Sequence, residues 1–295
     1  MEMQMPEGAA LYVVATPIGN LGDLSPRALE VLRAVDLIAA EDTRVTMKLC
    51  SHFDIHTPLV SNHQHNEENS GPRIAARMQA EGLKAALVTD AGTPAISDPG
   101  TYLVRACAER GIPVYAVAGP TAMGAAVSVS GFDFHDFTFY GFLPRDKGAL
   151  EEKLRRMPCA SEGAVVHESP FRVKDLMAAV LRVLPEAGVS LSCDLTKLHE
   201  LTVRGSPAEV LAALDENDKS EKGEYCLVLD LRSCKTEDET PKTEASLEGQ
   251  LLEMCFQGLD LREARESLIQ KGYRKNAVYA SAVAVKKFLE AQDNG

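Results

Sequence analysis

Long apolar runs, a basic leader and paired cysteines are all missing from this 295-residue sequence. No stretch approaches the ~18 to 20 apolar residues that a membrane-spanning helix needs, and the acidic start MEMQMPEG lacks the basic region of a signal peptide. The seven cysteines contain no Cys-x-x-Cys motif, which disfavours a zinc knuckle and a disulfide framework. We therefore expect a cytoplasmic protein with reduced thiols, no bound metal and no membrane contact.

An excess of positive charge is also missing. The chain has 31 Lys and Arg against 43 Asp and Glu, a formal net charge of −12, so it is not expected to coat nucleic acid with its whole surface. The exception is residues 256–295, where seven Lys and Arg stand against five Asp and Glu, a charge of +2. An anionic partner would have to meet a local basic patch of this kind.

Apolar runs typical of strands alternate with helical patterns, which predicts parallel strands joined by helical crossovers. We expect an α/β protein with an N-terminal domain at residues 9–119 and a second domain at 120–231. The second sheet is expected to be mixed, because FTFYGF and SLSCDL alternate apolar and polar residues. Residues 232–246 are nearly devoid of apolar side chains and predict an acidic flexible linker. Residues 247–295 predict a small helical appendage with about three helices.

Three glycine-rich turns follow predicted strands of the first domain: residues 15–23 (ATPIGNLGD), 89–100 (TDAGTPAISDPG) and 118–123 (AGPTAM). Open α/β sheets bind ligands at the carboxyl ends of their strands, so the three turns predict a ligand cleft. None carries Gly-x-Gly-x-x-Gly or the lysine of a nucleotide-phosphate loop, which argues against NAD and ATP. Gly92 would let a ligand approach the backbone closely. A purely structural turn, with Asp98 capping the next helix, explains the same residues.

Five segments resemble, in this order, the RsmI family of the tetrapyrrole methylase superfamily: VATPIGNLGDLSPRALEVLRAVDLIAAEDTR, VTDAGTPAISDPG, GFLPRDKG, HESPFR and LTKLHE. The resemblance covers roughly the whole chain. One departure is Ala118, which stands where the family usually has the first proline of a Pro-Gly-Pro turn. The resemblance implies a two-domain tetrapyrrole-methylase-like fold, a homodimer, and the cofactor S-adenosylmethionine. The implied reaction is 2′-O-methylation of a cytidine ribose in 16S ribosomal RNA, within the small ribosomal subunit.

The resemblance also implies which residues surround the cofactor between the two domains. The implied cofactor-binding residues are Pro17, Ile18, Gly19, Asp90, Ala91, Gly92, Thr93, Pro94, Ser97, Thr121, Ala122, Glu168, Ser169, Leu195, Thr196 and Lys197. The strand EYCLV would complete the adenosine pocket.

Methyl transfer requires the 2′-oxygen in line with the sulfonium methyl group and a way to remove the hydroxyl proton. No Lys-Asp-Lys-Glu tetrad can be recognised, so the identity of the base stays open. Asp42 and Arg44, at the end of a predicted strand that faces the cleft, are catalytic candidates, and Glu168 is a rival. An ion pair that merely orders the loop is the alternative interpretation of Asp42 and Arg44.

His63 and His65 suggest a zinc site, but no third ligand stands at a typical spacing. The resemblance instead favours contact of these two histidines with substrate or RNA. The candidate phosphate contacts are Arg44, Lys48, Arg145, Lys147, Arg274 and Lys275. Charged loops that are simply solvated are the alternative for each of them.

Two other functions fit the same fold. The first is a small-molecule methyltransferase acting on tetrapyrrole precursors. The helical appendage argues against it, because a porphyrin-sized substrate needs no basic extension. The second is a non-enzymatic binding module, which would bind S-adenosylmethionine without transferring its methyl group.

Overall fold

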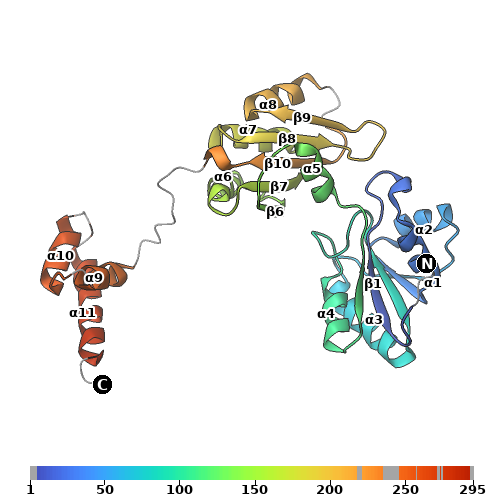
Figure 1. Cartoon of the computed structure of the whole chain (residues 1–295), viewed down its shortest axis with the longest axis horizontal. Coiled ribbons are helices and arrows are strands. Elements are labelled where there is room, and N and C mark those ends of the chain that lie inside the picture. The colour runs from blue at the N-terminus through green and yellow to red at the C-terminus, as the bar shows by residue number, and fades with distance from the viewer. Residues whose placement is uncertain are drawn as a thin grey trace. The chain divides into compact units, whose positions relative to one another are not determined.

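A computed structural model describes residues 5–217, 221–234, 246–256, 258–270, 273 and 275–292, without the side chains of 276 and 287–292. The chain forms two compact units, Met1–Lys235 and Thr236–Gly295, which can be followed by colour along the chain in Figure 1. The first unit contains two five-stranded sheets. Within the described part of the chain, no helix combines the length and hydropathy needed to cross a membrane.

The first sheet is parallel throughout, with the strand order β3-β2-β4-β1-β5. Its strands are β1 (Ala10–Val14), β2 (Leu37–Ala40), β3 (Leu59–Ser61), β4 (Lys84–Val88) and β5 (Val114–Val117). The three central strands β2, β4 and β1 are almost entirely buried, as expected for a parallel sheet covered on both faces. Their carboxyl ends therefore meet along one edge of the sheet.

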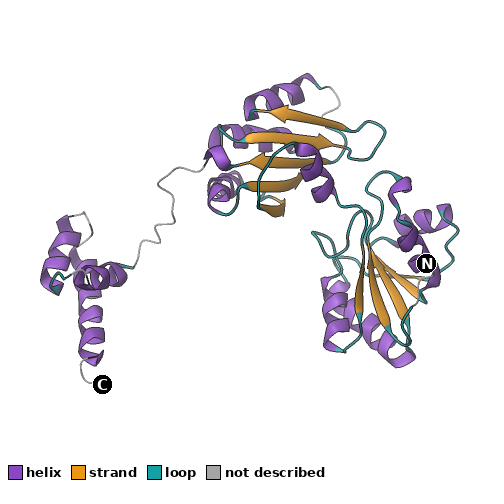
Figure 2. Ribbon diagram, in the orientation of Figure 1, coloured by secondary structure: helices purple, strands orange, loops and turns teal. Residues whose placement is uncertain are grey.

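Four helices cover this sheet: α1 (Pro26–Ala34), α2 (Thr43–His52), α3 (Glu67–Glu81) and α4 (Thr101–Glu109). One apolar cluster joins α1 and α2 to one face, and another joins α3 and α4 to the other face, so helices flank both sides (Figure 2). The Ser25 hydroxyl caps α1 by accepting from the Ala28 N–H at 3.1 Å, with Pro26 as the first helical residue. Gly82 ends α3 in the left-handed conformation.

The second sheet is mixed, with the order β6-β7-β10-β8-β9. Only β6 and β7 pair in parallel; the other neighbours are antiparallel. Its strands are β6 (Phe137–Phe142), β7 (Gly163–Glu168), β8 (Gly188–Cys193), β9 (Leu201–Gly205) and β10 (Tyr225–Asp230). Helix α5 (Ala122–Ser130) packs on one face. The opposite face carries α6 (Lys147–Arg156), α7 (Val173–Val183) and α8 (Pro207–Glu216).

A β-bulge interrupts β6. Its register against β7 shifts between Phe139 and Gly141, so Phe139 lies opposite Val165 and Phe142 lies opposite His167. In a regular strand two residues three positions apart point to opposite faces, but the extra residue Tyr140 brings Phe139 and Phe142 to the same face. Both rings contact the imidazole of His167, with centroid separations of 5.0 and 5.9 Å.

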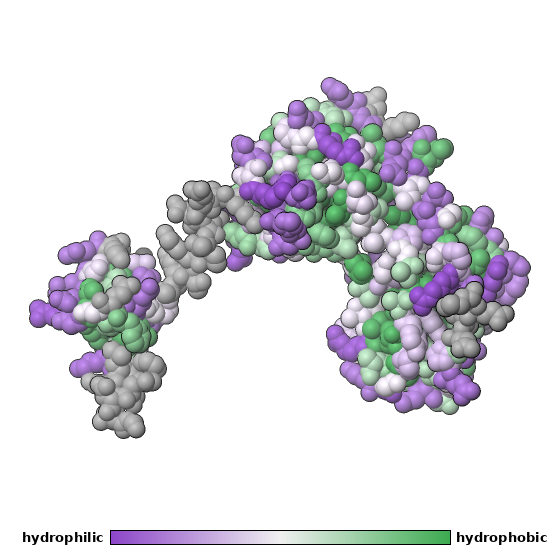
Figure 3. Space-filling view, viewed as in Figure 1, coloured by the Kyte–Doolittle hydropathy of each residue, from purple (hydrophilic) through white to green (hydrophobic). Residues whose placement is uncertain are grey.

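The second unit consists of α9 (Leu247–Phe256), α10 (Leu261–Gln270) and α11 (Lys275–Gln292). Its own apolar core includes Leu251, Leu268 and Val278, all fully buried. The helices expected in the C-terminal region are thus present. On the visible face of both units, apolar and polar residues are interspersed over the described surface (Figure 3). Each unit has buried apolar clusters of its own.

Candidate functional site

The loop between β4 and α4 is held against the turn after β1. The Thr16 N–H donates to the Gly92 carbonyl at 2.9 Å, and the Gly92 N–H donates back to Thr16 at 3.0 Å. The Thr16 hydroxyl donates to the Thr89 carbonyl at 3.1 Å. Gly92 has a φ of +83°, a conformation that glycine adopts without the steric penalty of a Cβ atom. Two of the three glycine-rich turns thus form one bridged unit at the carboxyl edge of the sheet.

The same loop carries an unusual backbone at Ala95 and Ser97. Their φ values are +64° and +66°, and a left-handed conformation is costly for residues other than glycine. The loop reaches β6 there, because a Cβ atom on Gly141 would lie 2.8 Å from the Ser97 Oγ. Gly141 itself has a φ of +61°. A larger residue at position 141 would therefore need an unfavourable backbone conformation and a shift of the Ser97 side chain.

The structural alternative that Asp98 caps the following helix is wrong. Gly100 is the N-cap residue of α4, and no side chain caps this helix. Instead, the Gly100 N–H donates to a carboxylate oxygen of Glu67 at 2.6 Å. Since that helix does not use the Asp98 carboxylate, Asp98 is available for another contact.

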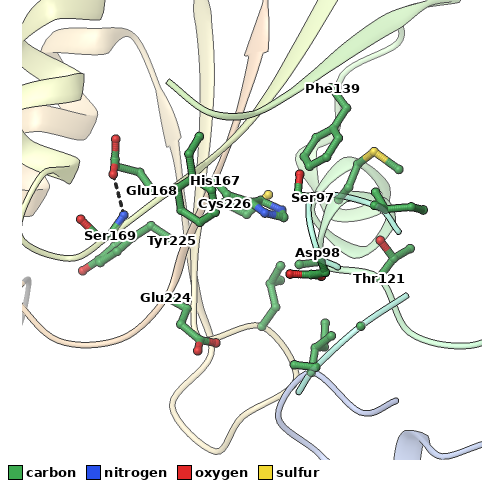
Figure 4. Close-up of a pocket in the computed structure, with 18 of the residues that line it drawn as sticks. Ser97, Asp98, Thr121, Phe139, His167, Glu168, Ser169, Glu224, Tyr225 and Cys226 are labelled. Atoms are coloured by element: carbon green, nitrogen blue, oxygen red, sulfur yellow. Dashed lines mark hydrogen bonds between the residues drawn. The ribbon is translucent and has the colours of Figure 1, made fainter. Parts of the chain in front are cut away.

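A cavity of about 400 Å³ lies where the turns after β1, β4 and β5 face β6, β7 and β10 (Figure 4). Both sheets of the first unit contribute to its wall. It brings together most of the residues proposed for the cofactor from the sequence: Ile18, Ala91, Gly92, Thr93, Ser97, Thr121, Ala122, Glu168, Ser169 and Leu195. The strand that begins with Tyr225 also lines it, as expected.

Six of the proposed cofactor residues do not line this cavity: Pro17, Gly19, Asp90, Pro94, Thr196 and Lys197. They lie within two positions of lining residues in the sequence. A Cβ atom on Gly19 would lie 2.5 Å from the Lys197 Cγ, and the Lys197 ammonium pairs with Asp194 at 2.8 Å and Glu224 at 3.0 Å. These contacts give Gly19 and Lys197 a packing role beside the cavity, and their part in cofactor binding stays a prediction.

Sequence reasoning missed a second set of lining residues: Ile96, Asp98, Met123, Phe139, Phe142, His167, Pro170 and Gly223. Phe139 and Phe142 could not be predicted as a pair, because it is the bulge in β6 that turns both side chains to the same face. His167 lies near the end of β7. Its Nε2 atom is buried and accepts or donates no hydrogen bond within the described part of the chain. A ligand atom in the cavity would be its natural partner.

The cavity and the adjoining edge of the first sheet are acidic. Burial raises the pKa of Asp98 to about 6, and the nearby carboxylates of Glu41 and Asp90 add to this effect. Burial likewise raises the pKa values of Glu41 and Asp90. Burial also lowers the pKa of His167, which keeps its imidazole neutral near pH 7. This environment favours a cationic ligand.

The cysteine in the cavity wall cannot act as a thiolate near neutral pH. Burial raises the pKa of Cys226 to about 12, and a thiol needs to be ionised to attack a substrate. Covalent chemistry through this sulfur is therefore disfavoured.

The chain shares its sequence with proteins of one known family. Residues 10–211 match the family model of the Tetrapyrrole (Corrin/Porphyrin) Methylases. The chain is 40% identical over 262 residues to ribosomal RNA small subunit methyltransferase I of Synechocystis sp., covering 88% of this chain and 92% of that protein. It is also 40% identical to the protein of the same name from Escherichia coli O157:H7, covering 92% and 94%. This chain belongs to the ribosomal RNA small subunit methyltransferase I family of tetrapyrrole methylases. The family and fold class expected from the sequence are thereby confirmed.

Solved structures of other proteins share the fold of the first unit. Uroporphyrin-III C-methyl transferase from Thermus thermophilus, complexed with S-adenyl homocysteine, is 18% identical and has a TM-score of 0.53 over 75% of this chain and 96% of that chain. Diphthine synthase is 13% identical, with a TM-score of 0.57 over 75% and 90%. At such identities, the likeness concerns the two-sheet architecture alone.

The three catalytic candidates of this methylase are all engaged in local contacts. Asp42 caps α2 by accepting from the Arg44 N–H at 2.8 Å, and its carboxylate pairs with the exposed Arg44 guanidinium at 2.6 Å. The hydrogen bonds from Arg44 lower the pKa of Asp42 to about 2. Neither residue lines the cavity. Glu168 does line it, but it is only 3% exposed, accepts from the Ser169 N–H at 2.8 Å and pairs with Arg172 at 3.3 Å.

The residues proposed for RNA contact in this methylase fall into three separate regions. His63 and His65 lie after β3, where the His65 N–H donates to the His63 Nδ1 at 3.1 Å. Arg145 and Lys147 are exposed beyond β6, and Lys275 begins α11 in the second unit. Arg274 lies outside the described residues. Within the described ranges, no group of three or more His, Cys, Asp or Glu side chains could hold a metal ion.

Proposed function

We propose that this methyltransferase transfers a methyl group from S-adenosylmethionine to the ribose 2′-hydroxyl of a cytidine in 16S ribosomal RNA. The observation that carries this proposal is the 40% identity, over 88% and 92% of the chain, to two relatives named as ribosomal RNA small subunit methyltransferases. The Thermus neighbour complexed with S-adenyl homocysteine supports the choice of cofactor.

The cavity residues fit S-adenosylmethionine in size and in chemistry. A volume of about 400 Å³ falls within the range of about 300–1,000 Å³ typical of small-molecule sites. Ile18, Met123 and Leu195 supply apolar surface, and Gly92 offers close approach to backbone. The unpartnered Nε2 of His167 offers a hydrogen-bonding atom. When bound there, the cofactor supplies a methyl group that its sulfonium already activates.

The residues of the chain have to hold the ribose in line with that methyl group and to accept the hydroxyl proton. Exposed Phe142 stands at the wall of the cavity, and the exposed cations Arg145 and Lys147 follow it in sequence. We place the RNA strand over this edge, where an aromatic ring can stack on a base and the cations can meet phosphates. Arg44 and Lys275 are further proposed phosphate contacts.

The wider setting is part of the same proposal. From the sequence pattern we take two domains at 9–119 and 120–231, a linker at 232–246 and RNA-contacting helices at 247–295. We also propose a cytoplasmic homodimer that acts on RNA within the small ribosomal subunit. Recognition of an assembled particle by shape would explain how a protein of net charge −12 meets a polyanion with only local basic patches.

The test is transfer of labelled methyl groups to small ribosomal subunits that lack this modification. We expect label in the 16S RNA, on a cytidine 2′-oxygen, after nuclease digestion. Free 16S RNA and tetrapyrrole precursors form the two comparison arms. Label in a tetrapyrrole and none in RNA would establish the rival small-molecule activity. Binding of S-adenosylmethionine without transfer to any of the three would favour the non-enzymatic module.

A further inference from the structure

Two exposed phenylalanine rings stand at one edge of the second sheet. Phe142 is the last residue of β6 and is 63% exposed, and Phe171 is the third residue after β7 and is 79% exposed. The two strands are parallel neighbours, so their carboxyl ends lie at the same edge. The Phe142 ring contacts His167, whereas Phe171 contacts no other aromatic ring in the described part of the chain. Its faces are therefore available to an external partner.

A tight turn fixes the backbone of Phe171. The Arg172 N–H and the Val173 N–H both donate to the Ser169 carbonyl at 3.1 Å. Pro170 holds the second position of the turn that starts at Ser169, a position that suits its fixed φ. Val173 begins α7 and is fully buried. The ring thus projects from an ordered backbone, and binding a partner would cost little loss of backbone freedom.

Arg172 ties this turn to the segment that follows Phe142. Its guanidinium donates to the Pro144 carbonyl at 3.0 Å. It also pairs with the buried carboxylate of Glu168 at 3.3 Å. One side chain therefore connects the chain after β6 to the chain after β7, and the segments that carry Phe142 and Phe171 are held in a fixed arrangement.

The two rings differ in their relation to the cavity. Phe142 lines the cavity wall, and so does Pro170, the residue before Phe171. Phe171 does not line the cavity, so its ring stands just outside the wall. An RNA strand that brings one nucleotide to the cavity across this edge would meet Phe142 at that nucleotide and Phe171 at an adjoining one.

The charges beside the rings fit a nucleic acid. Arg145 and Lys147 are exposed and follow Phe142 closely in the sequence. The acidic residue between them, Asp146, caps α6 by accepting from the Ala149 N–H at 2.9 Å. Cations can contact phosphates while aromatic rings stack on the faces of unpaired bases. An apolar protein partner would not need these cations, so the combination favours single-stranded RNA.

We propose that Phe171 stacks on the base next to the methylated cytidine in the ribosomal RNA, an inference that rests on the function proposed above. Phe142 then contacts the target nucleotide at the cavity wall, and Phe171 holds the neighbouring base unstacked from it. The pair of rings selects an RNA segment in which two consecutive bases are unpaired during the reaction. Phe171 contributes to binding of the substrate and not to the methyl transfer step itself.

The first test is a series of variants at this position: Phe171→Ala, Phe171→Leu, Phe171→Tyr and Phe171→Trp. Single-turnover methyl transfer is measured at saturating cofactor and rising concentrations of unmodified small subunits. The two variants without a ring should raise the half-saturating subunit concentration by about 10-fold or more, and the two aromatic variants should stay within about threefold of the wild type. The rate constant at saturating subunit should change by less than about twofold in all four.

Two measurements show whether the ring acts on the RNA alone. The S-adenosylmethionine Kd from calorimetry and the Tm from far-UV circular dichroism should match the wild type, because the ring is exposed and lies outside the cavity. A half-saturating concentration unchanged in Phe171→Ala would overturn the proposal. A Phe171→Leu protein as good as the wild type would show a plain apolar contact and overturn stacking. A raised cofactor Kd that accounts for the whole loss would also overturn it.

The second test identifies what the ring contacts. The photoreactive amino acid p-benzoylphenylalanine replaces Phe171 in one protein and Phe137 in the matched control. Phe137 is 39% exposed and begins β6, at the opposite end of the strand from Phe142. After irradiation with small subunits, the first protein should be cross-linked to 16S RNA at a nucleotide adjacent to the methylated cytidine, mapped by primer extension, and the control should not. A cross-link to a ribosomal protein or to a second copy of this chain in its place would overturn the proposal.

Failure of this inference can be told apart from failure of the proposed function. In each overturning result above, the wild type still methylates the ribosomal RNA, so only the assignment of Phe171 fails. A wild type that binds S-adenosylmethionine but methylates no ribosomal RNA would instead refute the proposed function and the role of Phe171 together.

Discussion

Replacing Asp98 by asparagine should stabilise the folded protein at neutral pH. The charged carboxylate is half-buried beside Glu41 and Asp90, and these surroundings raise its pKa from 3.8 to about 6. The native state thus binds this proton more tightly than the unfolded chain does. The free energy of unfolding therefore falls as pH rises from about 4 to about 6, and the penalty is complete at pH 7. Asparagine carries no charge at any of these pH values and escapes the penalty.

The size of the effect follows from the same pKa difference. A difference of about two pH units at 1.36 kcal/mol each sets a ceiling of about 3 kcal/mol. Solvent screening of a half-exposed group reduces this ceiling, and we expect about 1 kcal/mol at pH 7.5. Near pH 4.5 the native carboxyl group is mostly protonated, so the gain in the free energy of unfolding should fall to about a third of its value at pH 7.5.

Urea unfolding followed by far-UV circular dichroism measures this difference, since the chain has no tryptophan to report by fluorescence. Wild type and Asp98→Asn are compared at about pH 7.5 and about pH 4.5. The control is Glu109→Gln at the exposed end of α4, and it should match the wild type at both pH values. A variant no more stable than the wild type at pH 7.5, or a gain of equal size at both pH values, would refute the reasoning. The expected result would mean that the cavity keeps an unfavourable charge in place, the stability–activity trade-off seen at many active sites.

Three further outcomes are expected. Gly92→Val should abolish S-adenosylmethionine binding in calorimetry, because a branched side chain would enter the cavity wall near Ile18 from a backbone with a φ of +83°. Unchanged cofactor affinity would show that this loop is not part of the site. Arg172→Ala should lower the free energy of unfolding by about 2 kcal/mol, because it leaves the buried Glu168 carboxylate unpaired, and adding Glu168→Gln should restore part of the loss in urea titrations. Deleting residues 247–295 should leave cofactor affinity intact and weaken methyl transfer to the subunit, less so at low salt; a soluble truncation with the full rate would contradict RNA contact by these helices.

The regular parts of the fold could be predicted because their signals are local. Buried parallel strands appear as short apolar runs, and Ser25-Pro26 and Gly82 mark helix ends by their backbone chemistry. The edge strand β9 (Leu201–Gly205) was missed. Its residues are partly or fully exposed, so the sequence has no apolar run there. The strand is held by its backbone pairing with β8, which leaves no pattern of side chains.

The site was predictable to the extent that it depends on the turns after strands. Ala91, Gly92 and Thr121 line the cavity together because parallel strands end at one edge. Asp98 was missed because its sequence also fits a helix cap, and only the Glu67 contact to Gly100 shows that this helix needs no aspartate. The place of His167 in the cavity wall could not be predicted, because the lack of a hydrogen-bonding partner is a property of its three-dimensional surroundings.

The bulge in β6 makes the spacing of residues along that strand as important as their identity. Phe139 and Phe142 share a face only because Tyr140 is an extra residue relative to β7. A single deletion there would restore regular alternation and turn the Phe142 ring away from His167, even though every other side chain is kept. A substitution that keeps the chain length keeps the register with β7. In comparisons or redesigns of this family, an alignment gap within residues 137–142 would thus signal a rebuilt pocket wall more strongly than several substitutions.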